Sequence, residues 1–178
     1  MKKPTLLTTM ALTFLMLFAV NAHAQKFSGL DKSPLDITYY RTSRNEPPVA
    51  KVLYSRPQLK GRTLSSLAPN GKVWRTGANE ASEIKFYKDC TFGGKPVKAG
   101  TYSLYTIPGE KEWTIILNSD TDVWGAFSYS ESKDVLRVTA PVTMADDALE
   151  AFSIAFDDHG TMVLGWGNVR VSVPVSAN

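Results

Sequence analysis

The stretch AGTYSLYTIPGEKEWTIILN, residues 99–118, decides the fold. It contains two runs of β-forming residues, 101–107 and 112–118, on either side of a turn that includes Pro-Gly. Apolar side chains recur at every second position of the second run, which is the period of a strand with one buried face. The stretch therefore predicts a β-hairpin that packs one face against a hydrophobic core.

Runs of the same kind recur on both sides of this hairpin. They are residues 50–56, 83–88, 135–140, 151–156, 162–166 and 169–175. The Gly-Asn dipeptide between the last two runs predicts a two-residue hairpin turn. Helical patterns are limited to one turn at residues 64–68 and a short helix at residues 143–150.

Many short strands with little helix predict an all-β fold. We expect a single-domain β-sandwich with Greek-key or jelly-roll connections over residues 50–176. Residues 25–49, which are polar and contain glycine and a Pro-Pro pair, are expected to form a leader strand and loop.

The N-terminus has the three parts of a secretory signal peptide. Lys2 and Lys3 precede an apolar run over residues 6–20, and the small-x-small sequence Ala-His-Ala ends at residue 24. The run is 15 residues long, whereas a membrane-spanning helix needs about 20. We therefore expect a signal peptide over residues 1–24, and export to the periplasm or the medium. Gln25 at the new N-terminus, in place of Cys, argues against a lipoprotein.

The charge balance argues against nucleic acid as a partner. The chain has 20 basic and 17 acidic residues, and removing the two lysines of residues 1–24 leaves 18 against 17, a net charge near +1. Nucleic-acid binding needs a strong basic excess. The distribution is uneven, because residues 41–75 hold eight basic residues and one acid. This segment forms either an anion-binding surface or a solvated, charge-paired one.

Cysteine and histidine are too few for most catalytic or metal chemistry. Cys90 is the single cysteine, so an internal disulfide is impossible, and its apolar neighbourhood predicts a buried small hydrophobe. His159 is the single histidine after residue 24, and it lies in a turn-like Asp-Asp-His-Gly sequence. We therefore expect no metal site, no cofactor and no Ser or Cys nucleophile with a histidine base.

Several motifs of the chain resemble a known family. They are YSRP-x-x-KGR (54–62), VWRTGANE (73–80), AGTYSLYTIPG (99–109), EWTIILN (112–118), WGAF (124–127) and DVLRV (134–138). Together they resemble exported bacterial proteins grouped as the domain of unknown function number two-nine-one-one. The resemblance covers residues 50–175 and implies domain boundaries. It implies no activity and no catalytic residue.

Basic, aromatic and amide side chains concentrate in these polar motifs. Guanidinium groups suit carboxylates and phosphates, indole rings offer flat apolar faces, and an amide both donates and accepts hydrogen bonds. The candidate ligand-binding residues are Arg56, Lys60, Arg62, Trp74, Arg75, Asn79, Glu80, Trp124 and Arg137. The alternative is that the arginines pair with acids, the tryptophans lie in the core, and no site exists.

Three functions fit these observations. The first is a non-catalytic module that binds a carbohydrate, a peptide or an anionic group. The second is a carboxylate-dependent glycoside hydrolase, for which Glu80 and Asp134 would be the pair. The third is a purely structural envelope protein without a ligand site.

Overall fold

The computed structural model describes residues 25–177, and the predicted signal peptide lies outside the described residues. The strands all belong to one compact unit, Asp31–Asn178. None of the helices within residues 25–177 is long and apolar enough to cross a membrane.

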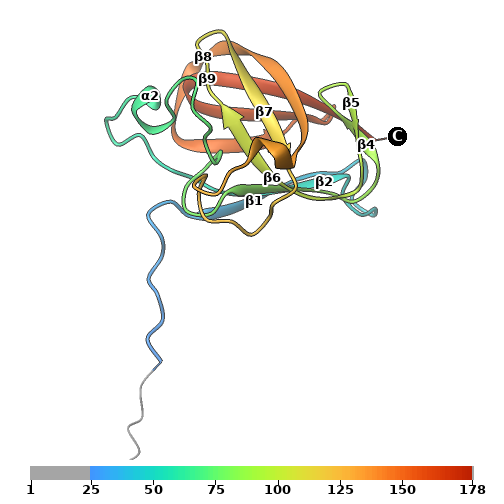
Figure 1. Cartoon of the computed structure of the whole chain (residues 1–178), viewed down its shortest axis with the longest axis horizontal. Helices are drawn as coiled ribbons and strands as arrows, with labels where there is room; N and C mark the ends of the chain where they lie inside the picture. The colour runs from blue at the N-terminus through green and yellow to red at the C-terminus, as the bar shows by residue number, and fades with distance from the viewer. Residues whose placement is uncertain (1–24, 178) are drawn as a thin grey trace, which may run out of the picture. The chain divides into compact units, whose positions relative to one another are not determined.

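The all-β prediction is confirmed. Nine antiparallel strands form one sheet in the order β1-β2-β3-β6-β7-β8-β9-β4-β5 (Figure 1). The strands are β1 (Leu35–Tyr40), β2 (Ala50–Ser55), β3 (Ser82–Phe86), β4 (Cys90–Phe92), β5 (Lys95–Val97), β6 (Gly100–Ile107), β7 (Glu112–Asn118), β8 (Asp134–Phe156) and β9 (Thr161–Ala177). One turn of helix, α2 (Leu64–Leu67), and one 3-10 turn, η1 (Glu131–Lys133), complete the described elements.

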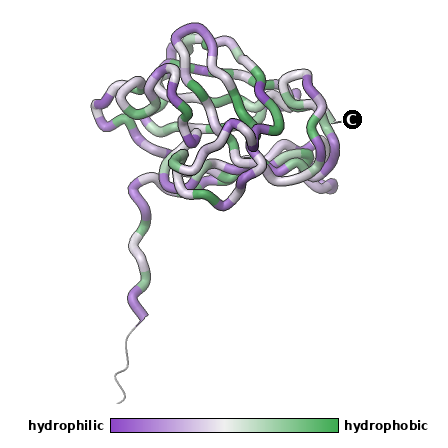
Figure 2. Tube along the Cα trace, in the orientation of Figure 1, coloured by the Kyte–Doolittle hydropathy of each residue, from purple (hydrophilic) through white to green (hydrophobic). Residues whose placement is uncertain are grey.

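The hairpin predicted from residues 99–118 is confirmed as β6 and β7. Leu104 pairs with Leu117 across the ladder, and both side chains are fully buried. The turn between the strands requires its glycine, because a Cβ atom on Gly109 would collide with the carbonyl oxygen of Glu112. Figure 2 shows hydrophobic and hydrophilic residues interspersed along the folded chain.

The second half of the chain differs from the expectation, because four predicted runs merge into the two long strands β8 and β9. The predicted helix at residues 143–150 and the predicted turn at Gly-Asn 167–168 are both wrong. The register of β8 against β9 shifts between Met144 and Leu149, so residues 145–148, with the sequence Ala-Asp-Asp-Ala, bulge out of the ladder. The Asn168 amide donates to the Ala145 carbonyl at 2.8 Å, which holds this bulge on β9.

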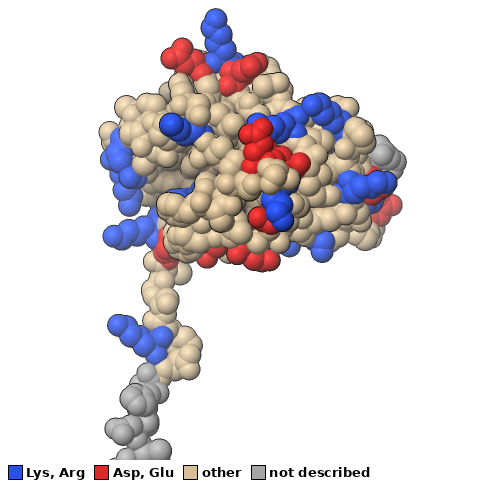
Figure 3. Space-filling view, in the orientation of Figure 1, with Lys and Arg blue, Asp and Glu red and all other residues tan. Residues whose placement is uncertain are grey.

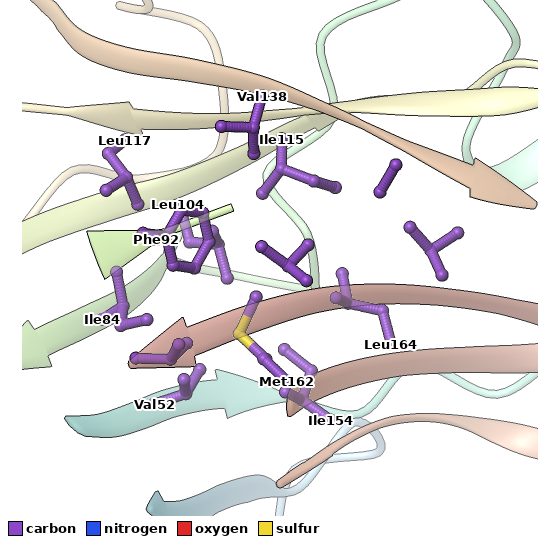
Figure 4. Packing of buried hydrophobic residues seen from close by; sticks show 14 of the residues in the cluster. Val52, Ile84, Phe92, Leu104, Ile115, Leu117, Val138, Ile154, Met162 and Leu164 are labelled. Atoms are coloured by element: carbon purple, nitrogen blue, oxygen red, sulfur yellow. The ribbon is translucent and has the colours of Figure 1, made fainter. Parts of the chain in front are cut away.

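One hydrophobic core joins distant parts of the sheet. Figure 4 shows side chains from β2, β3, β4, β6, β7, β8 and β9 that point into a shared interior. The sheet is therefore folded over on itself, so that its inner faces pack together. The 57–59 segment after β2 closes one side, where the Leu59 amide donates to the Glu150 carbonyl of β8 at 2.9 Å.

Cys90 is part of this core, as predicted from its sequence neighbours. Its side chain is fully buried, and burial raises the pKa of the thiol to about 11. Since the thiolate is the reactive form, we expect the folded protein to be inert toward a disulfide reagent at pH 8. The thiol should react at once after unfolding in guanidinium chloride. Rapid stoichiometric labelling of the folded protein would contradict this placement.

Candidate functional site

Two polar loops meet on the outer side of β6 and β7. We call residues 73–81 and residues 119–130 the paired loops. Glu80 and Trp124 form a β-bridge, the Ala81 amide donates to the Val123 carbonyl at 2.9 Å, and the Gly125 amide donates to the Asn79 carbonyl at 3.0 Å. The WRTGANE and WGAF motifs, far apart in sequence, therefore lie side by side.

The paired loops carry most of the unusual backbone of the described chain. Thr76, Asn79 and Asp122 have φ values of 55°, 62° and 58°, a region that non-glycine residues rarely occupy. Thr76 is the least expected of the three, because it is β-branched, and it is fully buried. The Ser82 hydroxyl donates to its carbonyl at 2.8 Å and helps to hold this conformation. Backbone strain of this kind concentrates at functional sites.

Gly77 allows the first of the paired loops to pack closely on β2. A Cβ atom at this position would lie 2.9 Å from the Ser82 hydroxyl and 3.0 Å from the Ser55 carbonyl oxygen. We expect Gly77→Ala to lower the free energy of unfolding by about 1–3 kcal/mol, because backbone atoms would have to move. Gly29→Ala is the matched control, since nothing lies within 4 Å of a Cβ atom there. Equal urea-unfolding midpoints for the two variants would show that the close packing at Gly77 is unimportant.

Arg75 is the unusual side chain of the paired loops. Its Nε atom is buried and has no hydrogen-bond partner. No hydrogen bond or ion pair joins its guanidinium to any residue in the described part of the chain. A Cβ atom on Gly125 would be 3.3 Å from Arg75 Nη1 and 2.9 Å from the ring of Phe127. The guanidinium and that ring therefore lie on the same side of the loop, close to Gly125.

Two large aromatic side chains of the second paired loop are open to solvent. The exposed fraction is 60% for Trp124 and 86% for Phe127. Glu80, the bridge partner of Trp124, is also exposed, and Asn79 is partly exposed. The structure thus gathers four of the predicted residues, Arg75, Asn79, Glu80 and Trp124, around one loop pair. It adds Phe127, which the sequence analysis did not single out.

Trp74 does not join this site. It is 7% exposed and lies in the core, where its ring stacks on Trp166 with 5.5 Å between ring centroids. It also meets Phe152 edge-on at 5.0 Å. The alternative that the tryptophans lie in the core is therefore correct for Trp74. It is wrong for Trp124, which is exposed.

Arg56, Lys60 and Arg62 lie elsewhere, where the segment after β2 meets the end of β8. The Arg56 guanidinium donates to the Phe152 carbonyl at 3.1 Å, and it forms an ion pair with Asp36 at 3.2 Å. The Lys60 amide donates to the Glu150 carboxylate, and Arg62 donates to the carbonyls of its own loop. These contacts fix the path of the chain, and they bond the Arg56 and Arg62 guanidinium groups to acceptors within the protein.

Arg137 belongs to a third cluster beneath the second paired loop. Its Nε atom donates to Asp134 Oδ2 at 2.6 Å, and its Nη2 atom contacts the Tyr129 hydroxyl at 2.7 Å. Tyr129 and Asn118 also donate to the Asp134 carboxylate, at 2.7 and 2.8 Å. Burial, followed by the hydrogen bond to Asp134, raises the pKa of Tyr129 to about 12.

A cleft of about 190 Å³ opens beside the paired loops. Its lining residues are Leu35, Leu53, Tyr54, Ser55, Glu80, Ala81, Ser82, Glu83 and Asp122. It places the exposed carboxylate of Glu80 at the border between the loops and the outer face of β2 and β3. No group of acidic, cysteine and histidine side chains within residues 25–177 has the arrangement of a metal site. In Figure 3, cations and anions are interspersed over the visible face.

Comparison with known proteins identifies a family for this chain. The sequence matches the family described as "Protein of unknown function (DUF2911)" over residues 35–175. No curated protein and no solved structure matches the chain. The match includes every strand except the last residues of β9, so it covers the whole folded sheet together with both paired loops. The chain therefore belongs to the DUF2911 family.

Proposed function

We propose that this domain is a non-catalytic binding module, and that it takes the carboxylate of an acidic carbohydrate at Arg75. The single observation that carries the proposal is the unpartnered Arg75 guanidinium, on the same side of Gly125 as the solvent-exposed Phe127 ring and in a loop pair that also exposes Trp124.

An unpartnered buried donor on a permanent charge is costly. Leaving such a donor unsatisfied costs about 1–3 kcal/mol, and more where the group is charged. The guanidinium is a planar fork of donors that matches a carboxylate with two parallel hydrogen bonds. A ligand carboxylate at Arg75 would supply acceptors to the two Nη atoms, which, unlike Nε, are not buried and have no acceptor within the described chain. The other three arginines discussed above have acceptors within the protein, which is why we assign the ligand to Arg75.

The surroundings of Arg75 favour a sugar over a bare anion. Trp124 and Phe127 present apolar faces on which the carbon face of a sugar ring can pack. Asn79 and Glu80, on the neighbouring loop, carry the donors and acceptors that ring hydroxyls use. A binding site with aromatic anchors and few polar groups is the usual composition of a small-ligand site.

The test compares glucuronate with glucose, which differ by the carboxylate. We expect glucuronate to raise the melting temperature of the protein and to show heat of binding in calorimetry, and glucose to do neither. Arg75→Gln should abolish both effects of glucuronate. Arg62→Gln, which removes an exposed guanidinium bound within its own loop, should retain them. Glucuronate binding that survives in Arg75→Gln, or the absence of any binding by the wild type, would overturn the proposal.

Arg75→Gln also distinguishes a ligand-binding role of Arg75 from a structural one. Because Arg75 has no acceptor in the described chain, Arg75→Gln should leave the melting temperature of the free protein unchanged or raise it. A structural arginine would instead lose hydrogen bonds on substitution. A clear fall in the melting temperature would therefore favour the purely structural function.

The hydrolase alternative has weaker support. Asp134, one of its two carboxylates, has a side chain that is 7% exposed and accepts hydrogen bonds from Asn118, Tyr129 and Arg137. A catalytic carboxylate has to reach the substrate. Asp134 is better suited to hold the second paired loop in place.

Export remains part of the proposal, because the N-terminal sequence is that of a signal peptide. Purification of the full-length product from an exporting host should give a chain that begins at Gln25. An intact N-terminus on the exported protein would contradict this.

A further inference from the structure

A second polar site lies on the outer face of the β1-β2-β3-β6 part of the sheet. Strand residues alternate between two faces, and the core side here is formed by residues such as Val52 and Ile84. The register places four outward-facing residues in one row across the four strands. They are Tyr39, Lys51, Lys85 and Thr101.

Two like charges stand directly opposite each other in this row. Lys51 pairs with Lys85 across the β2–β3 ladder. Both residues are only partly exposed, and neither forms an ion pair with an acid within the described residues. Like charges directly opposite in an antiparallel pair are destabilising. The free protein therefore bears an electrostatic cost at this place that no ion pair of the described chain offsets.

The two lysines line a shared hollow. The hollow has a volume of about 180 Å³, and its other lining residues are Leu53, Glu83 and Thr101. Thr101 pairs with Lys85 and brings a hydroxyl group to the same wall. Glu83 is the one acid of the lining, and its Oε1 atom accepts a hydrogen bond from the Asp122 amide at 2.8 Å. That contact holds the Glu83 carboxylate toward the second paired loop.

A third cation and two aromatic rings adjoin the lysines. The Arg41 guanidinium lies over the Tyr39 ring, 5.0 Å from its centroid. The Lys85 ammonium lies 4.8 Å from the Tyr87 centroid. Both rings are about two-fifths exposed, at 43% and 40%. Cations and rings together form one end of this face, whereas Glu80, Glu83 and Asp122 line the adjoining cleft.

We propose that Lys51 and Lys85 bind a doubly charged anionic group, a phosphate or a sulfate, with Thr101 as a hydroxyl donor. Two ammonium groups match the charge of a dianion, and lysine binds phosphate as a point charge. Bound anion would convert the repulsion between the lysines into attraction to a common partner. Glu80 and Asp122, which line the adjoining cleft and not the hollow, disfavour an anion in that cleft. This site is independent of the carboxylate site at Arg75.

The first experiment measures melting temperatures without added anion, in chloride at fixed ionic strength. Lys51→Gln and Lys85→Gln should each raise the melting temperature by about 1–3 °C, because each removes the repulsion. Lys98→Gln is the matched control, since it removes the same charge from a lysine that is paired with Asp89 at 2.7 Å. It should not raise the melting temperature. A fall in the melting temperature of both Lys51→Gln and Lys85→Gln would overturn the proposal.

The second experiment replaces chloride with phosphate at pH 8 and equal ionic strength. Phosphate should raise the melting temperature of the wild type, of Lys98→Gln and of Arg75→Gln by a few degrees, and leave the Lys51→Gln/Lys85→Gln double variant unchanged. Parallel titrations with sulfate and glucose 6-phosphate distinguish a free ion from an esterified phosphate. A phosphate effect that persists in the double variant, or that is missing in the wild type, would overturn the assignment. Loss of the effect in Arg75→Gln would show that the anion binds at the paired loops instead.

Discussion

Replacing Trp74 with alanine is expected to lower the free energy of unfolding by about 3–5 kcal/mol. The indole is 7% exposed and contacts Trp113, Phe152 and Trp166, with ring centroids 6.1, 5.0 and 5.5 Å away. Truncation removes both the buried apolar area and the aromatic contacts, and the rigid neighbouring rings cannot collapse into the cavity. Trp74 also forms a β-bridge with Thr106 through its backbone, which keeps the cavity open.

Urea unfolding, followed by far-UV circular dichroism, measures this loss. Trp124→Ala is the control, because it removes the same ring from a residue that is 60% exposed. We expect the free energy of unfolding of Trp124→Ala to lie within about 1 kcal/mol of the wild-type value. If both tryptophan variants lose similar stability, the division between a core indole and a ligand-facing indole is incorrect.

The second large effect is expected at Asp134. Its carboxylate accepts hydrogen bonds from Asn118, Tyr129 and Arg137, and the side chain is 7% exposed. Asp134→Ala removes the acceptor that these three donors share, and one of the donors is charged. Asn118 keeps the Ser130 carbonyl and Arg137 keeps the exposed Glu131. Hydrogen bonds to charged groups contribute about 1.5–3 kcal/mol each. The Arg137 side chain is 35% exposed, so water partly replaces the hydrogen bond that it loses. We therefore expect a loss of about 2–4 kcal/mol.

The control for Asp134 is Glu131→Ala, which removes the other acid that contacts Arg137. The Glu131 side chain is 76% exposed, so its substitution should barely change the unfolding midpoint. Asp134→Asn keeps an acceptor oxygen and loses the charge. Its unfolding midpoint in chemical denaturation should lie between those of Asp134→Ala and Glu131→Ala. An Asp134→Ala variant as stable as Glu131→Ala would mean that the cluster does not hold the second paired loop.

The hairpin and the core strands could be predicted from the sequence, because a period of two is a local signal. In β7 the buried Trp113, Ile115 and Leu117 follow this period, although Ile116 between them is also buried, because residues of the paired loops cover the outer face. The bulge at residues 145–148 could not be predicted, since its sequence, Ala-Asp-Asp-Ala, lacks a period of two and resembles the start of a short helix. What decides between them is a contact from β9, where Asn168 and Arg170 bond to the carbonyls of the bulge. The local sequence pattern does not indicate a long-range contact of this kind.

The candidate site was predictable in part. The composition of the polar motifs marked nine residues, seven of them basic or aromatic, together with Asn79 and Glu80. The fold distributes them over the paired loops, the segment after β2, the core and the Asp134 cluster. Trp74 and Trp124 look alike in the sequence, yet one is buried and the other exposed. The unpartnered state of Arg75 depends on where every acceptor lies, so composition alone could not separate it from Arg56. Phe127 gave no signal apart from its position in the WGAF motif.

The most direct measurement is a nuclear magnetic resonance titration that follows the arginine Nε–H and tryptophan indole N–H signals as glucuronate is added. The account predicts that the Arg75 and Trp124 signals shift together and saturate, while the Arg56 and Arg137 signals, already held by acceptors, stay in place. Shifts at Arg56 or Arg137 with an unmoved Arg75 signal would contradict the assignment of the ligand site to the paired loops.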